Sequence, residues 1–165
     1  MIRTRSFAIS VAAMVTLGIL TACSSDTSST TDTGVTPAST SPVACESPEA
    51  GTGTSVGVSE QDFTIELDDD SVRSGSTTFT VDNAGPSTHE FVVFQTDLAP
   101  DAMPVGEDGN VDEAGEGVTV VDEIEDIGAG CTAALTIDLD AANYVVLCNI
   151  TGHYAAGMHA PLTVK

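Results

Sequence analysis

Hydrophobic and polar residues alternate with a period of two along the C-terminal part of the chain. Phe63, Ile65 and Leu67 are expected to face one side of an extended segment, with polar residues on the other side. Short segments bounded by Gly, Pro, Asn and Asp are typical of β-strands. Comparable segments follow at 78–81, 89–94, 118–121, 135–139, 144–148 and 162–164.

This pattern predicts one all-β domain over residues 51–165, a β-sandwich or barrel of about seven or eight strands. We find no internal repeat and no amphipathic helix in it. The longest interruption, 95–117, is long enough for a turn of helix or a functional segment. Its many acidic residues are interpreted as a solvated surface.

Residues 1–22 have the layout of a secretory signal peptide. Arg3 and Arg5 precede an apolar run, 7–20, that is short for a membrane span. The run ends in Leu-Thr-Ala-Cys, which resembles the bacterial lipobox and makes Cys23 the expected lipidated first residue of the mature protein. The alternative is an ordinary signal peptide with an accidental cysteine.

The segment 23–50 is predicted to be a lipid-anchored stalk. It is rich in Ser, Thr and Pro and cannot bury enough apolar surface to become ordered. A flexible coil of about 25 residues reaches roughly 25–30 Å. Such a stalk would hold the domain near a membrane, clear of the lipid headgroups.

Charge and histidine content exclude several function classes. The chain has 25 acidic and four basic side chains, a formal net charge of −21. Nucleic acid is therefore excluded as the main partner, because binding phosphates requires Lys and Arg. Only three histidines occur, too few for an enzyme with several copper centres. No nucleophile triad, acid–base pair or phosphate-binding loop is found either.

The C-terminal segment combines a thiol, an imidazole and a thioether in the spacing Cys148-x4-His153-x4-Met158. A further imidazole, His89, begins an earlier predicted strand. Two histidines and a cysteine with a distant axial methionine form a blue-copper electron-transfer site. Taken singly, each of these residues is more simply interpreted as a buried thiol, an ordinary histidine or a core methionine. Together they predict one copper ion.

On these residues the sequence resembles the cupredoxins, over roughly residues 54–165. The Cys-x4-His-x4-Met spacing is most similar to the rusticyanin and sulfocyanin branch. The turn Asn83-x-Gly85 is similar to the cupredoxin segment that leads into the first ligand. The resemblance implies a Greek-key β-sandwich with one type 1 copper at one end. Its ligands would be His89, Cys148, His153 and Met158.

Three residues next to these ligands are expected to support them: Asn83, Glu90 and Asn149. Plastocyanins and azurins have an asparagine after the first histidine, where this chain has Glu90. An ionised carboxylate only accepts hydrogen bonds, so this departure affects the reduction potential rather than the copper assignment. Asn149 is a candidate for the supporting hydrogen bond. His159, next to Met158 on an extended segment, is expected to face solvent.

Cys45 and Cys131 remain once Cys23 is assigned to lipid and Cys148 to copper. Disulfides persist in exported proteins, so one bridge between these two cysteines is expected. It would close a long loop and contribute roughly 4 kcal/mol. Free thiols or a mixed pairing are the alternatives.

These observations predict an electron carrier rather than an enzyme: a monomeric lipoprotein that is extracytoplasmic and membrane-anchored. Its expected partners are membrane-associated redox proteins, which would approach His153 across the small residues that follow it. The alternative is an extracytoplasmic copper chaperone or reservoir with the same ligands. The strong acidity is compatible with a basic docking partner or with a saline habitat.

Overall fold

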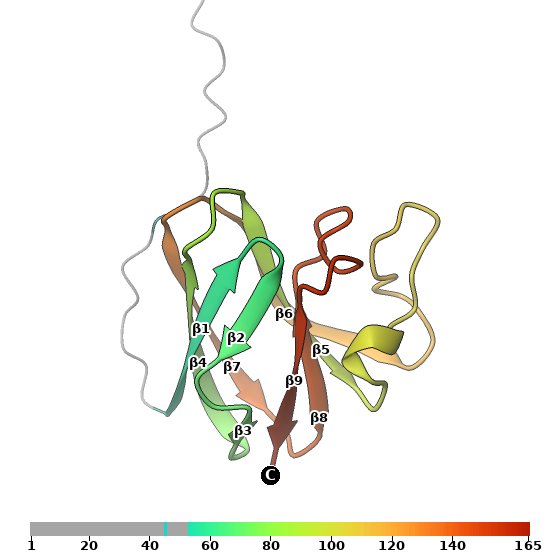
Figure 1. Ribbon diagram of the computed structural model, residues 1–165. Helices are drawn as coiled ribbons and strands as arrows, with labels where there is room; N and C mark the ends of the chain where they lie inside the picture. Colours follow the sequence, from blue (N-terminus) through green and yellow to red (C-terminus); the bar gives the residue numbers. More distant parts are fainter. Residues whose placement is uncertain (1–44, 46–52) are drawn as a thin grey trace, which may run out of the picture. The chain divides into compact units, whose positions relative to one another are not determined.

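The computed structural model describes Cys45 and residues 53–165, which form a sandwich of two β-sheets (Figure 1). The strands of this part are β1 (Thr54–Gln61), β2 (Thr64–Leu67), β3 (Ser71–Val72), β4 (Gly75–Asn83), β5 (His89–Thr96), β6 (Val118–Ile127), β7 (Thr132–Leu139), β8 (Asn143–Leu147) and β9 (His159–Val164). A short 3-10 helix, η1 (Pro100–Ala102), lies between β5 and β6.

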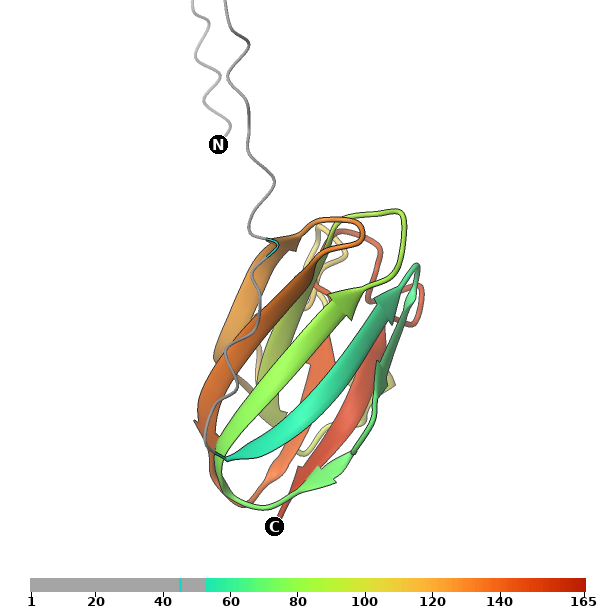
Figure 2. The ribbon, with the colours of Figure 1, turned by 90° about the vertical axis from the view of Figure 1, so that its left-hand side faces the viewer.

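The first sheet has the order β2-β1-β4-β7, and Figure 2 shows it face-on. β1 pairs antiparallel with β2 and parallel with β4, and β4 pairs antiparallel with β7. Inward-facing residues such as Val56 and Val58 alternate with more exposed ones along β1. This alternation is expected of a strand with one face buried.

The second sheet has the order β3-β9-β8-β5-β6. β5 and β8 lie inside it and are buried on both faces. Their inner side chains, among them Phe91 and Val146, join Phe79 of the first sheet in the main core. Their outer side chains, among them Phe94 and Leu147, form a second core with Met103 and Val111 of the β5–β6 connection.

Three connections lie together at one end of the sandwich: β1–β2, β4–β5 and β8–β9 (Figures 1 and 2). Each carries residues that the following subsection assigns to the site. The chain end at Lys165 lies at the opposite end of the sandwich. The topology thus brings distant segments of the sequence to one place.

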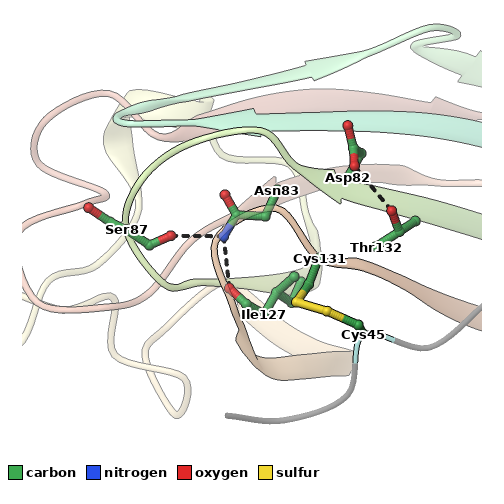
Figure 3. The surroundings of a disulfide bond; sticks show 7 residues. All are labelled: Cys45, Asp82, Asn83, Ser87, Ile127, Cys131 and Thr132. Atoms are coloured by element: carbon green, nitrogen blue, oxygen red, sulfur yellow. Dashed lines mark hydrogen bonds between the residues drawn. A yellow bond between two sulfur atoms is a disulfide. The ribbon is translucent and has the colours of Figure 1, made fainter.

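A disulfide joins Cys45 to Cys131, just before β7 (Figure 3). The expected pairing is therefore present. The carbonyl of Cys131 accepts a hydrogen bond from the backbone N–H of Asn83 at 2.9 Å. The bridge thus holds Cys45 next to the turn at the end of β4.

The predicted all-β sandwich is confirmed, with nine strands in the described residues instead of seven or eight. The prediction for Phe63 is wrong: this residue lies in the β1–β2 turn and is 42% exposed. The segment 95–117 contains a turn of helix, as expected, and its acidic side chains are exposed. The predicted signal peptide, Cys23 and nearly all of the stalk lie outside the described residues.

No helix in the described part of the chain has the length and apolar character to cross a membrane.

Candidate metal centre

Three of the four predicted ligands lie at the ends of strands, and the fourth lies in a connection between two of them. His89 is the first residue of β5, Cys148 follows β8 directly, and Met158 directly precedes β9. His153 lies between the latter two, in the β8–β9 connection, which we call the ligand loop (residues 148–158). The pairing of β8 with both β5 and β9 brings these strand ends together.

Three of the predicted ligands place their donor atoms within 4.8 Å of one another: His89, Cys148 and His153. Cys148 Sγ lies 3.3 Å from His153 Nδ1 and 4.0 Å from His89 Nδ1. The two Nδ1 atoms are 3.3 Å apart. One thiol and two imidazole nitrogens therefore face a common point, an arrangement that can hold a single metal ion.

Met158 is fully buried and belongs to the same core cluster as Cys148. Its backbone closes the ligand loop, because its carbonyl accepts from the Cys148 N–H at 3.1 Å and its own N–H donates to the His153 carbonyl at 3.1 Å. Gly157, with φ +107°, makes the turn just before it, a conformation that favours glycine. These contacts place the thioether residue beside the other ligands.

Burial sets the charge state of the site without metal. Desolvation raises the pKa of the Cys148 thiol to about 12, although hydrogen bonds from the backbone of Glu90 and Ile150 oppose this effect. Burial and the neighbouring His153 lower the pKa of His89 below its usual value. Metal uptake must therefore displace the thiol proton, whereas the imidazole is already suited to be a neutral ligand.

Glu90 supports the thiol through its backbone rather than its side chain. Its backbone N–H donates to Cys148 Sγ at 3.4 Å. Sequence reasoning considered only the carboxylate, which is half-buried and has its pKa raised to about 7, mainly by desolvation. The Asn-to-Glu departure therefore leaves the sulfur with a hydrogen-bond donor.

Asn83 holds the turn that leads to His89. Its buried side-chain amide donates to the carbonyls of Ser87 and Ile127, both at 2.8 Å, as Figure 3 shows. Its Oδ1 accepts from the Gly85 N–H at 3.0 Å. Asn83 thus fixes the β4–β5 connection against the end of β6.

Asn149 supports the site differently from the expectation. Its Oδ1 accepts from the Val111 N–H at 2.6 Å, and its Nδ2 donates to the Val111 carbonyl and to Glu113. Tyr154 is also buried, and its hydroxyl accepts from the Met103 N–H at 3.0 Å. Both residues attach the ligand loop to the β5–β6 connection.

His159 lies outside the three-residue cluster and is partly exposed. Its ring packs on that of Tyr154, with 5.2 Å between the ring centroids. The expectation that His159 points away from the metal ligands agrees with this position.

Sequence reasoning missed two residues of the β1–β2 turn. His89 Nε2 lies 3.1 Å from Asp62 Oδ1, and the Phe63 ring packs edge-on against His153 with 5.1 Å between centroids. Asp62 also accepts from the Ser87 hydroxyl, the main cause of its lowered pKa. No signal in the sequence distinguished this acid from the other acidic residues.

A buried carboxyl, Glu60, also lies near the site. It is fully buried on β1, and neither of its oxygens has a hydrogen-bond partner within the part of the chain that the structure describes. Desolvation, with a smaller contribution from Glu90, raises its pKa to about 8. The same carboxyl is one of the charges that raise the pKa of Cys148.

Fold and site together define a β-sandwich protein with one mononuclear metal centre. Residues 52–165 match the family described as copper binding proteins, plastocyanin/azurin family. The chain therefore belongs to the plastocyanin/azurin family. No curated protein matches the chain.

Solved structures share the fold at low identity. Dithionite-reduced auracyanin from the photosynthetic bacterium Roseiflexus castenholzii is 21% identical, with a TM-score of 0.53, covering 70% of this chain and 99% of its own. Auracyanin B is 17% identical, with a TM-score of 0.51, and the match covers 72% of this chain and 93% of auracyanin B. Reduced rusticyanin is 21% identical, with a TM-score of 0.50, and the match covers 69% of this chain and 79% of rusticyanin.

The donor set fits copper. A thiol and two imidazoles converge, with a buried methionine beside them, and this is the ligand combination of a type 1 centre. The cofactor of this family member is accordingly one type 1 copper ion.

Proposed function

We propose that this protein is a one-electron carrier, with His89, Cys148, His153 and Met158 as copper ligands. The convergence of the Cys148 thiol with two imidazole Nδ1 atoms carries this proposal. When bound, copper supplies the one-electron Cu(II)/Cu(I) couple. The chain itself contributes a preformed, mostly buried set of donors held by backbone hydrogen bonds.

His153 is the proposed contact with redox partners. It is partly exposed, whereas His89 and Cys148 are fully buried. The residues after it in the ligand loop, Ala155 and Ala156, are small and exposed. A partner can therefore approach the His153 ring closely, which shortens the path between the two redox centres.

We further propose that the carrier works as a monomer at the outer face of a membrane, anchored by lipid on Cys23. The lipobox-like sequence Leu-Thr-Ala-Cys supports the anchor, and the Ser- and Thr-rich segment up to residue 50 supports a tether. Its partners in this proposal are membrane-associated redox proteins. Mass spectrometry of the membrane-extracted protein tests the lipid on Cys23.

The visible spectrum of the copper-loaded protein tests the redox function. We expect a strong thiolate-to-copper band in the oxidised protein that disappears on reduction. Cys148→Ser removes the thiolate and should abolish the band, while Met103→Leu, a buried change away from the ligands, should preserve it. A colourless protein after addition of Cu(II) would contradict the proposal.

A chaperone or reservoir would bind copper through the same residues but exchange it readily. Copper loss to a strong chelator and the electron self-exchange rate, measured on the same sample, separate the two functions. We expect slow copper loss and fast electron exchange. Rapid loss with slow exchange would favour the chaperone.

A further inference from the structure

Asp62 lies outside the ligand set and contacts the side chain of a ligand directly. It lies in the β1–β2 turn, far from the ligands in sequence, and its Oδ1 is 3.1 Å from His89 Nε2. An ionised carboxylate only accepts hydrogen bonds, so the proton of this pair belongs to Nε2 of the imidazole. The lone pair is then on Nδ1, the atom that faces Cys148 and His153.

We propose that Asp62 is a positioning residue of the copper site, which fixes the tautomer and orientation of His89 and favours Cu(II). A carboxylate bound to the second nitrogen of a ligating histidine makes that ligand more basic. A more basic ligand with a negative charge behind it stabilises the more highly charged ion. This inference rests on the proposed copper function.

Ser87 holds the Asp62 carboxylate in this position. Its hydroxyl donates to Oδ2 of Asp62 at 2.8 Å, which leaves Oδ1 for the histidine. The carbonyl of Ser87 accepts from the buried Asn83 amide. The turn before His89 therefore orients both the ligand and the carboxylate that binds it.

Gly85 provides the space for this pair. A Cβ atom at this position would lie 2.9 Å from Asp62 Oδ1 and 3.1 Å from His89 Nε2. Any larger residue would therefore push the carboxylate away from the ring. The close approach explains the glycine of the Asn83-x-Gly85 turn, which the sequence resemblance left without a physical role.

Four variants test the proposal in the full chain. Asp62→Ala removes the hydrogen bond and the charge, and Asp62→Asn keeps an acceptor oxygen but removes the charge. Ser87→Ala and Gly85→Ala disturb the carboxylate without replacing it. Asp82→Asn is the matched control, because Asp82 is an exposed carboxylate that also accepts from a hydroxyl, that of Thr132, at 3.1 Å.

Cu(II) affinity and reduction potential are the first readouts. We expect Asp62→Ala to lower Cu(II) affinity by roughly 10–100-fold, as is typical for loss of such a partner, with smaller losses in Asp62→Asn, Ser87→Ala and Gly85→Ala. A tenfold loss confined to Cu(II) raises the one-electron potential by about 59 mV. The control should remain within about twofold of wild type. Equal affinities and potentials in Asp62→Ala and the control would overturn the proposal.

The second readout follows the tautomer directly by ¹⁵N NMR of the imidazole in the copper-free chain, where Nδ1 is not held by metal and both tautomers are accessible. We expect a protonated Nε2 on His89 in wild type and a mixture of tautomers in Asp62→Ala. An unchanged tautomer in the variant would refute the positioning role. A wild-type protein without the thiolate-to-copper band would instead refute the proposed function, and the copper-free spectra would still decide the role of Asp62. If Asp62→Ala fails to fold, Asp62→Asn and Ser87→Ala provide the same comparison.

Discussion

The two histidines of the copper site are held in different ways. His89 is fully buried at the start of a strand, and its second ring nitrogen is bound to Asp62. His153 lies on the ligand loop, is partly exposed and is contacted by the exposed ring of Phe63. One side of the site is thus fixed by the sandwich and the other reaches solvent. This division suits a centre that must keep its metal while exchanging electrons.

The largest expected effect comes from removing each histidine in turn. His153→Gly and His89→Gly should both abolish the thiolate-to-copper band. Added imidazole should restore it in His153→Gly, because that position is open to solvent, but not in His89→Gly, whose position is buried. Titration with imidazole at constant copper measures the difference. Equal recovery in both variants would remove the distinction between the two sides.

The disulfide supports the His89 side of the site. Replacing Cys45 and Cys131 together with serine opens a loop with a sequence separation of 86 residues. We expect the free energy of unfolding to fall by roughly 4 kcal/mol, as measured by urea denaturation. The absorption band should stay in place, since the ligands themselves are retained. An unchanged denaturation midpoint would show that the bridge contributes nothing to stability.

Glu60, on the buried side of the site, should make the free energy of unfolding depend on pH. Burial raises the pKa of Glu60 from its ordinary 4.5 to about 8 in the folded chain, so the folded state keeps a proton that the unfolded state loses. The contribution of Glu60 to the free energy of unfolding is therefore fully present below pH 4.5 and is lost as the pH rises towards about 8. At about 1.4 kcal/mol per pKa unit, the decrease amounts to a few kcal/mol.

Glu60→Gln removes this ionisation while preserving the shape of the side chain. The metal-free variant should gain stability over wild type as the pH rises from 4.5 to 8, as measured by urea denaturation at several pH values. Glu90 titrates in the same range and contributes to the raised pKa of Glu60, so the same comparison is made in a Glu90→Gln background. Glu66→Gln, on the exposed face of β2, is the control. A pH-independent difference between Glu60→Gln and wild type would contradict the prediction.

Phe63→Ala should have the smallest effect on stability, because the side chain is 42% exposed. We expect a change within about 1 kcal/mol. The reaction with small redox reagents should become faster, because the edge of His153 is uncovered, and stopped-flow absorption measures this rate. Leu98→Ala, a comparably exposed apolar residue at 36%, should leave the rate unchanged. Equal rates in the two variants would mean that Phe63 does not shield His153.

The sequence was sufficient to predict the ligands, because they lie close together in the sequence or follow a recognisable turn. Cys148, His153 and Met158 lie in one short segment with a recognisable spacing, and His89 follows a turn of a known type. Asp62 could not be predicted, because it is one of 25 acidic residues and only the topology brings it to His89. Glu60 was missed for a similar reason, since acids are rarely buried.

The strand prediction failed where hydrophobicity was weak or continuous. β1 was missed because Gly57 and two serines separate its two inward valines from further apolar residues. Phe63 was placed on the same face as Ile65 and Leu67 because it continues their alternation, although the chain turns before β2. The second core was not anticipated, because the apolar runs of β5 and β8 give no sign that both faces are buried.

The attachment of the ligand loop to the β5–β6 connection constrains how this protein can be engineered or can diverge. Asn149 and Tyr154 bind backbone groups of Val111 and Met103. A ligand loop of another length, transplanted from a relative, would leave these groups without partners in a buried region. Exchange of the loop therefore requires a compensating replacement of residues 103–111, and the two segments should be inherited as one module.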